Sequence, residues 1–124
     1  MAVITDSTGA QRSSLLPTLI VSDVRAAGAL VASSLYKYPT RDIVSIGITG
    51  TNGKTSTAYL LEGILRQLGK ITGLSSTAER HIAGVTFISR LTTPEASELH
   101  ALIARMKEES VDSVVIEVSA QALT

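Results

Sequence analysis

Apolar and polar residues follow two different spacings along this chain. Six runs are short, and most are apolar and rich in β-branched residues, as β-strands usually are. These runs are residues 2–5, 18–21, 43–48, 71–75, 85–88 and 113–118. The run at 43–48 is almost continuously apolar, which is typical of a buried parallel strand. The first run ends in Asp6-Ser7-Thr8-Gly9, which is expected to form a turn.

Three longer stretches repeat apolar residues every three or four positions and are expected to form helices. They run from the capping pair Ser22-Asp23 to about Tyr38, from Lys54 to Leu68, and from Thr93 to about Glu109. In the last of these, Thr93 is expected to cap the helix and Pro94 to be its first residue. Leu99, Ile103 and Met106 are expected to be its buried side chains.

Strands that alternate with helices predict an α/β fold with a mainly parallel sheet. The pair Arg41-Asp42 separates a first group of elements from the strand, loop and helix that follow it. We therefore expect two parts, a small α/β unit at residues 1–40 and a second α/β domain at residues 41–124.

Composition excludes several classes of function. The 124 residues include 11 basic and 11 acidic side chains, and only 3% are aromatic, so neither the charge nor the stacking surface of a nucleic-acid-binding protein is present. No cysteine occurs, which excludes disulfides, thiolate metal sites and a thiol nucleophile. No apolar run approaches the roughly 20 residues that cross a bilayer. We therefore expect a cytoplasmic protein that contacts neither membrane nor nucleic acid.

The segment Gly47 to Ser56, GITGTNGKTS, is the most informative part of the chain. It lies between a predicted strand and a predicted helix, where a glycine-rich loop can turn its backbone N–H groups toward a phosphate. Lys54 is predicted to contact the β- and γ-phosphates as the catalytic cation, and Thr55 to ligate Mg²⁺. The predicted nucleotide ligands are Gly50, Thr51, Asn52, Gly53, Lys54, Thr55 and Ser56.

Glu117 interrupts an apolar strand near its predicted carboxyl end, the edge at which α/β sheets bind ligands. There it is predicted to hold Mg²⁺ together with Thr55. Thr92 and Thr93 are ambiguous from their chemistry, because two hydroxyls at a helix start serve equally well as a cap or as an anion site. His81 and His100 have no partner at metal-ligand spacing and are interpreted as solvated surface residues.

Taken together, these segments resemble the Mur ligases, the ATP-dependent amide-forming enzymes of peptidoglycan precursor synthesis. The resemblance rests on VSDVR (21–25), GITGTNGKTS (47–56), LTTPEASE (91–98) and EVSAQAL (117–123). The last two motifs resemble the MurE type, which adds the third residue of the peptide stem to a UDP-muramoyl dipeptide. The chain resembles less than half of such a ligase.

The resemblance implies the end of an N-terminal UDP-substrate domain at residues 1–40 and the first part of a central ATPase domain at 41–124. It implies ATP and Mg²⁺ as cofactors, a UDP-muramoyl peptide and an amino acid as substrates, and a monomeric parent enzyme. Thr92, Thr93 and Ser119 are implied substrate contacts. The family usually has serine and histidine where this chain has Ala120 and Gln121, which affects substrate recognition.

Two alternatives stay open at this point. The chain could be a non-catalytic nucleotide-binding module, or a glutamate ligase of the folylpolyglutamate synthase type. That family typically carries glycine where this chain has Thr55. The fragment alone is not expected to catalyse ligation, because none of its residues supplies a base for the amine.

Overall fold

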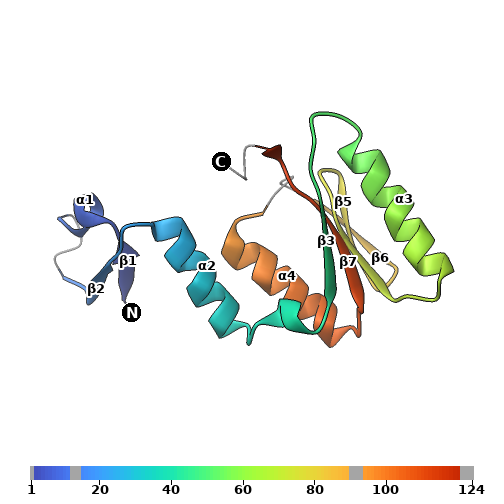
Figure 1. Ribbon diagram of the computed structural model, residues 1–124. Helices are drawn as coiled ribbons and strands as arrows, with labels where there is room; N and C mark the ends of the chain where they lie inside the picture. Colours follow the sequence, from blue (N-terminus) through green and yellow to red (C-terminus); the bar gives the residue numbers. More distant parts are fainter. Residues whose placement is uncertain (1, 12–14, 90–93, 121–124) are drawn as a thin grey trace.

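The computed structural model describes residues 2–11, 15–89 and 94–120 (Figure 1). Its centre is a five-stranded sheet in the order β3-β7-β4-β5-β6. The strands are β3 (Val44–Ile48), β4 (Thr72–Ser75), β5 (Glu79–Ile82), β6 (Val85–Ile88) and β7 (Ser113–Glu117). The α/β class predicted from the sequence is confirmed.

The sheet is mixed, so the prediction of a mainly parallel sheet was only partly right. Strand β7 pairs in parallel with β3 on one side and β4 on the other, whereas β4-β5 and β5-β6 are antiparallel. The physical reason is the length of the connections. Residues 76–78 and 83–84 are too few for the crossover that parallel neighbours need, but they suffice for hairpins.

Helices α3 (Lys54–Gln67) and α4 (Ala96–Glu108) cover opposite faces of the sheet (Figure 1). Side chains of β7 alternate between them, as a strand's pleat requires. Val115 belongs to the core cluster under α3, whereas Val114 and Ile116 belong to the cluster under α4. All five residues of β7 are buried, so the strand that ends in Glu117 is an interior strand of the sheet, between β3 and β4.

Several predicted boundaries need correction. Strand β5 was missed, because its residues Glu79, Arg80 and His81 do not form an apolar run. Strand β3 is at an edge of the described sheet, with Val44 63% exposed, and is not the buried strand that its composition suggested.

Helix α4 was expected to begin at Pro94, but Glu95 is its N-cap and Ala96 its first residue. The predicted cap, Thr93, lies outside the described residues. Ile103 and Met106 are buried as predicted, and Leu99 is partly buried against the same cluster.

The N-terminal elements form a separate small unit (Figure 1). Strands β1 (Val3–Thr5) and β2 (Thr18–Ile20) pair in parallel. Residues 6–9, predicted as a turn, largely belong to the short helix α1 (Ser7–Ala10), whose first turn Asp6 caps by accepting from the Gly9 N–H. Helix α2 (Val24–Leu35) follows, capped by Asp23, and packs on α4.

Helix α2 ends three residues before the predicted end. Lys37 and Tyr38 have positive φ angles, and a short 3₁₀ helix, η1 (Pro39–Arg41), leads into the sheet. The apolar residues whose spacing predicted α2 lie mostly on its exposed side, with Leu30 71% and Leu35 74% exposed. Among the described residues, α2 contacts α4, and Ala32 is the residue of α2 that is buried.

Across the parts of the chain that the structure describes, no helix combines the length and the apolar character needed to cross a membrane.

Candidate functional site

Three loops meet at one edge of the sheet because β3, β7 and β4 are parallel neighbours and end on the same side. The glycine-rich loop 49–53 follows β3, Glu117 is the last residue of β7, and Ser76-Thr77-Ala78 follows β4. Glu117 is opposite Ile48, the residue from which the glycine loop starts. The topology thus brings the two predicted parts of the site together.

The glycine loop has the backbone conformation for which its glycines were singled out. Gly50 has a φ angle of +146° and Gly53 a φ angle of +77°, both in the region that side-chain-bearing residues avoid. Gly53 is the N-cap of α3, so the positive end of the helix dipole faces the loop. The Lys54 Nζ turns back over the loop and donates to the Gly50 carbonyl at 2.7 Å.

The remaining predicted nucleotide ligands lie along the same segment. Thr51, Asn52 and Ser56 are exposed, and Lys54 and Thr55 are half-buried. The exposed polar groups are therefore open to a ligand at the start of α3.

Glu117 is the buried acid of this edge, with 1% of the residue exposed. Its Oε1 accepts from the Thr55 hydroxyl at 2.7 Å. Its Oε2 accepts from the Thr77 N–H at 2.7 Å and from the Thr77 hydroxyl at 3.1 Å. Burial alone would raise the pKa of Glu117, but the hydrogen bonds from Thr55 and Thr77 and the charge of Lys54 hold that pKa below its usual value. The carboxylate is therefore ionised at neutral pH.

Thr77 is a site residue that our sequence interpretation missed. It holds one oxygen of Glu117 through two hydrogen bonds and leaves the other oxygen turned toward Thr55. The signal was present in the sequence. Ser75 is the last residue of a short strand, and Ser76 and Thr77 follow it, so three hydroxyls occur in a row. They lie at the sheet edge where the carboxyl ends of the parallel strands meet, and the prediction for Glu117 used the same edge.

The oxygen pair of Thr55 and Glu117 has the chemistry that a small hard cation requires. Mg²⁺ prefers oxygen ligands and keeps several waters, so one or two protein oxygens together with phosphate oxygens suffice to hold it. No group of three or more histidine, cysteine or acidic side chains that could hold a metal occurs in the described ranges. The residues present therefore fit a cation that is shared with a bound phosphate, and not a cation held by protein alone.

The predicted substrate contacts of Thr92, Thr93 and Ser119 stay predictions. Thr92, Thr93 and Gln121 lie outside the described residues. Ser119 is half-buried and follows Glu117 by two positions, at the same edge as the glycine loop. Ala120, the other departure from the family pattern, is exposed just after it.

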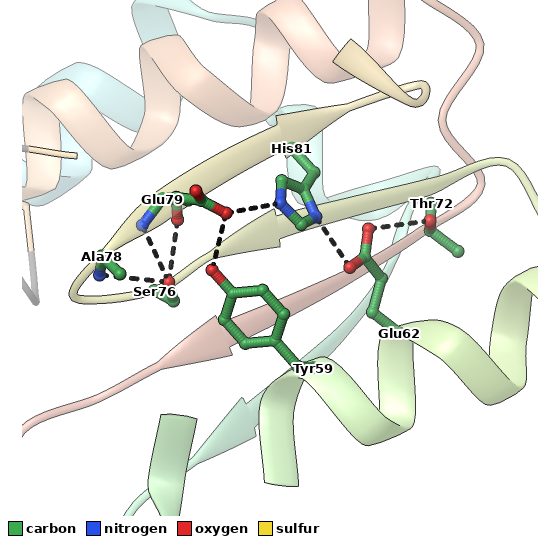
Figure 2. A network of polar contacts seen from close by, with 7 residues as sticks. All are labelled: Tyr59, Glu62, Thr72, Ser76, Ala78, Glu79 and His81. Carbon is green, nitrogen blue, oxygen red and sulfur yellow. Dashed lines mark hydrogen bonds and ion pairs between the residues drawn. The ribbon is translucent and has the colours of Figure 1, made fainter. Parts of the chain in front are cut away.

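A second polar cluster lies under α3, between the helix and strands β4 and β5 (Figure 2). His81 Nδ1 is 2.7 Å from Glu62 Oε2, and His81 Nε2 is 3.3 Å from Glu79 Oε2. The Tyr59 hydroxyl donates to the same Glu79 oxygen at 2.9 Å. The Thr72 hydroxyl donates to the other Glu62 oxygen at 3.2 Å. The side chains of Glu62 and His81 are only 4% and 13% exposed.

The structure corrects the interpretation of both histidines. His81 is not a solvated surface residue, since it bridges two glutamates and its ring meets the Tyr59 ring edge-on at a centroid distance of 5.5 Å. His100 is half-buried on α4, and its Nδ1 is buried without a hydrogen-bond partner. Neither residue showed a sequence pattern from which these positions could be predicted.

Contacts within the cluster lower the pKa of Glu79, whereas the pKa of Tyr59 is raised. Hydrogen bonds from Tyr59 and His81 lower the pKa of Glu79. Burial raises the pKa of Tyr59, and the nearby Glu79 and Glu62 raise it further, against the hydrogen bond with Ser76, so the phenol keeps its proton and donates it.

Comparison with known proteins gives one family and a set of similar relatives. Residues 48–124 match the Mur ligase middle domain. The chain is 52% identical over 126 residues to a UDP-N-acetylmuramyl-tripeptide synthetase of Leifsonia xyli, with 100% of the chain and 24% of that protein covered. It is 50% identical over 125 residues to a UDP-N-acetylmuramoyl-L-alanyl-D-glutamate–2,6-diaminopimelate ligase of Streptomyces avermitilis, with 99% of the chain and 24% of that protein covered. The chain therefore spans about a quarter of the length of these curated relatives.

Proposed function

The chain belongs to the Mur ligase family, and on that premise we propose that it carries the nucleotide-binding part of a ligase that adds the third residue of the peptidoglycan stem peptide. The reaction would use ATP to activate the terminal carboxylate of a UDP-muramoyl dipeptide as an acyl phosphate, which the amine of the incoming amino acid then attacks.

One observation carries the proposal. The hydroxyl of Thr55, directly after Lys54 in the glycine-rich loop, is joined at 2.7 Å to the ionised carboxylate of Glu117. A lysine, a hydroxyl and a carboxylate at a helix N-terminus suit the polyphosphate of a nucleotide and its Mg²⁺.

Each residue has a role of its own in the proposed site. Gly50, Thr51, Asn52, Gly53 and Ser56 would cradle the phosphates through their N–H groups and hydroxyls. Lys54 would neutralise charge between the β- and γ-phosphates, and Thr55 and Glu117 would hold Mg²⁺. When bound, Mg²⁺ would withdraw charge from the phosphate oxygens and so favour attack on the γ-phosphate.

The remaining parts of the proposal concern the substrate. We propose that residues 1–40 end a UDP-substrate domain and that residues 41–124 begin the ATPase domain. Thr92, Thr93 and Ser119 would contact the muramoyl peptide. The amino acid is either diaminopimelate, which is part of the name of the Streptomyces avermitilis relative, or lysine.

Nucleotide binding is tested on the chain itself by titration calorimetry with ATP and Mg²⁺. Replacing Lys54 by alanine removes the cation that faces the phosphates, so Lys54→Ala is expected to weaken binding by tenfold or more. Lys107→Ala, at the far end of α4, is the matched control and is expected to bind like the original chain. Equal affinity for the original chain and Lys54→Ala would contradict the phosphate-loop assignment.

Activity is tested on the product of the complete reading frame that encodes this chain. We expect release of inorganic phosphate from ATP only when the UDP-muramoyl dipeptide and either diaminopimelate or lysine are both present. Binding of ATP without ligation would support the non-catalytic alternative, and turnover of a folate with glutamate would support the folylpolyglutamate alternative.

A further inference from the structure

Helix α3 carries the proposed metal ligand and the buried polar cluster on the same face. Thr55, Tyr59 and Glu62 are spaced by four and three residues, so they point to one side of the helix over two turns. Thr55 contacts the end of β7, Tyr59 contacts β5, and Glu62 contacts both β4 and β5. The helix is therefore tied to three neighbouring strands by polar contacts and not by apolar packing alone.

The cluster is also linked to Glu117 by a second route. Glu79 begins β5, and its backbone carbonyl accepts from the N–H and the hydroxyl of Ser76 at 3.0 and 2.9 Å. The Ser76 hydroxyl oxygen also accepts from the backbone N–H groups of Ala78 and Glu79 at 3.3 and 3.1 Å (Figure 2). These bonds close a tight turn with Thr77 inside it, and Thr77 holds Glu117 Oε2.

The two routes form a closed ring of contacts. One route runs from α3 through Thr55 to Glu117 Oε1. The other runs from α3 through Tyr59 and Glu79 to the turn, and from Thr77 to Glu117 Oε2. The orientation of the Glu117 carboxylate thus depends on where Glu79 is held.

His81 joins the ring to the buried Glu62. Both ring nitrogens face carboxylate oxygens, and ionised carboxylates only accept hydrogen bonds. A neutral imidazole has one N–H and would leave a nitrogen lone pair against one carboxylate, whereas an imidazolium donates to both. The other oxygen of the buried Glu62 accepts from the Thr72 hydroxyl, so Glu62 is held from two sides.

We propose that His81, held between Glu62 and Glu79, is a positioning residue that fixes Glu79 and the Thr77 turn and thereby orients Glu117 toward the cation that accompanies the nucleotide. This inference rests on the proposed function for the cation, but the orientation of Thr77 can be measured without any nucleotide. The titratable groups that face His81 are Tyr59 and Glu62 from α3 and Glu79 from its own strand. Its neighbours on β4 and β6 are uncharged.

The first test measures the Thr77 N–H directly by amide hydrogen exchange in the protein without nucleotide. His81→Gln removes the ring that bridges the two glutamates but keeps a side chain that can hydrogen-bond. It is expected to speed exchange at Thr77 about tenfold, while amides in the centre of β7 change by less than twofold. His100→Gln is the matched control, since His100 is the only other histidine of the chain. Unchanged Thr77 exchange in His81→Gln would overturn the proposal.

The second test measures ATP affinity with and without Mg²⁺. His81→Gln is expected to lose about tenfold in affinity with Mg²⁺ and to change less than twofold without it, because Lys54 and the glycine loop are untouched. Equal losses in both conditions would indicate general structural damage and overturn the positioning role. Failure of the original chain to bind would instead count against the proposed function and leave the exchange result standing.

The third test uses a second variant. Tyr59→Phe keeps the ring against His81 but removes the hydroxyl that donates to Glu79, and it is expected to lose about threefold in ATP affinity with Mg²⁺. If His81→Gln does not fold, this variant decides, and unchanged Mg²⁺-dependent affinity in it would refute the proposal.

Discussion

At the residue scale, Glu117 combines burial with an ionised carboxylate, and this combination makes stability depend on pH. Its pKa in the folded chain is held below the usual value by its hydrogen bonds. A carboxylate of this kind stabilises the fold fully above its unfolded-state pKa of about 4.3, and the stabilisation is lost as the pH falls through the lower folded-state value.

Glu117→Gln is therefore expected to be less stable than the original chain at pH 7 by about 1.5–3 kcal/mol, the range for hydrogen bonds to charged groups. The amide would place N–H groups against the donors of Thr77 or Thr55. The difference should shrink as the pH falls below about 4.3, because the carboxylate of the unfolded original chain is protonated there, and the stabilisation is lost as the pH falls through the lower folded-state pKa. Urea unfolding followed by circular dichroism at a series of pH values measures it.

Glu108→Gln is the matched control, because Glu108 is exposed near the end of α4 and pairs with the exposed Arg105. It should change stability by less than about 0.5 kcal/mol, as surface substitutions usually do. A Glu117→Gln difference that stays constant from pH 7 to pH 3 would contradict the assigned charge state.

Individual residues differed in how well sequence could predict them. Glu117 could be predicted because a single carboxylate interrupts an apolar strand near its end. Thr55 and Gly53 could be predicted because their loop has a local pattern. His81 and Glu62 could not, because they are 19 residues apart and their contact depends on strand β5, which has no apolar pattern.

At the element scale, strand β4 and helix α3 each contain a glycine, but the two glycines differ in the space around them. Gly73 lies in buried β4, and a Cβ there would come within 2.6 Å of the Met106 sulfur and 3.3 Å of Val114 Cγ2. Gly63 lies in α3, and nothing lies within 4 Å of an added Cβ. The first glycine is required by close packing between sheet and helix, and the second is not.

Gly73→Ala is expected to destabilise the chain by about 1–3 kcal/mol, the usual cost of overpacking a core. Gly63→Ala is expected to stabilise it by about 0.5–1 kcal/mol, because alanine is the better helix former. Chemical denaturation of both variants side by side gives the comparison. Equal effects of the same sign would show that the packing of α4 on β4 is not the one described here.

Elements with a strong local pattern were predicted well, and elements defined by their neighbours were not. Helix α3 starts at the predicted residue and ends within one residue of the predicted end, and Gly69 follows it with a φ angle of +81°. Strand β3 was predicted as buried because it is apolar, but the position of a strand within a sheet depends on contacts distant in sequence. The antiparallel β5 was missed because its residues form no apolar run, and its place in the sheet depends on its pairing with β4 and β6.

At the scale of the whole molecule, the chain has two parts joined through α2. The small N-terminal unit contacts the rest through the packing of α2 on α4 (Figure 1). Gly28 and Ala29 of α2 line a hollow together with Ala96 of α4, and Ala32 of α2 is buried. The proposed domain boundary at residue 40 lies in η1, directly after α2.

Replacing Ala32 by leucine is expected to force α2 away from its neighbours, since overpacking costs about 1–3 kcal/mol. If residues 1–40 are a separate unit, amide hydrogens of α2 should exchange about tenfold faster or more, while those of β7 and α3 keep their protection. Mass spectrometry of peptides after deuterium exchange resolves the two regions.

Leu30→Ala is the control for this last experiment, because Leu30 is on the same helix but 71% exposed. Its exchange should match that of the original chain in every peptide. Faster exchange of β7 and α3 together with α2 in Ala32→Leu would mean that the chain unfolds as one cooperative unit. The boundary at residue 40 would then separate two parts in sequence but not in stability, and the N-terminal unit would contribute to holding the glycine loop and Glu117 in place.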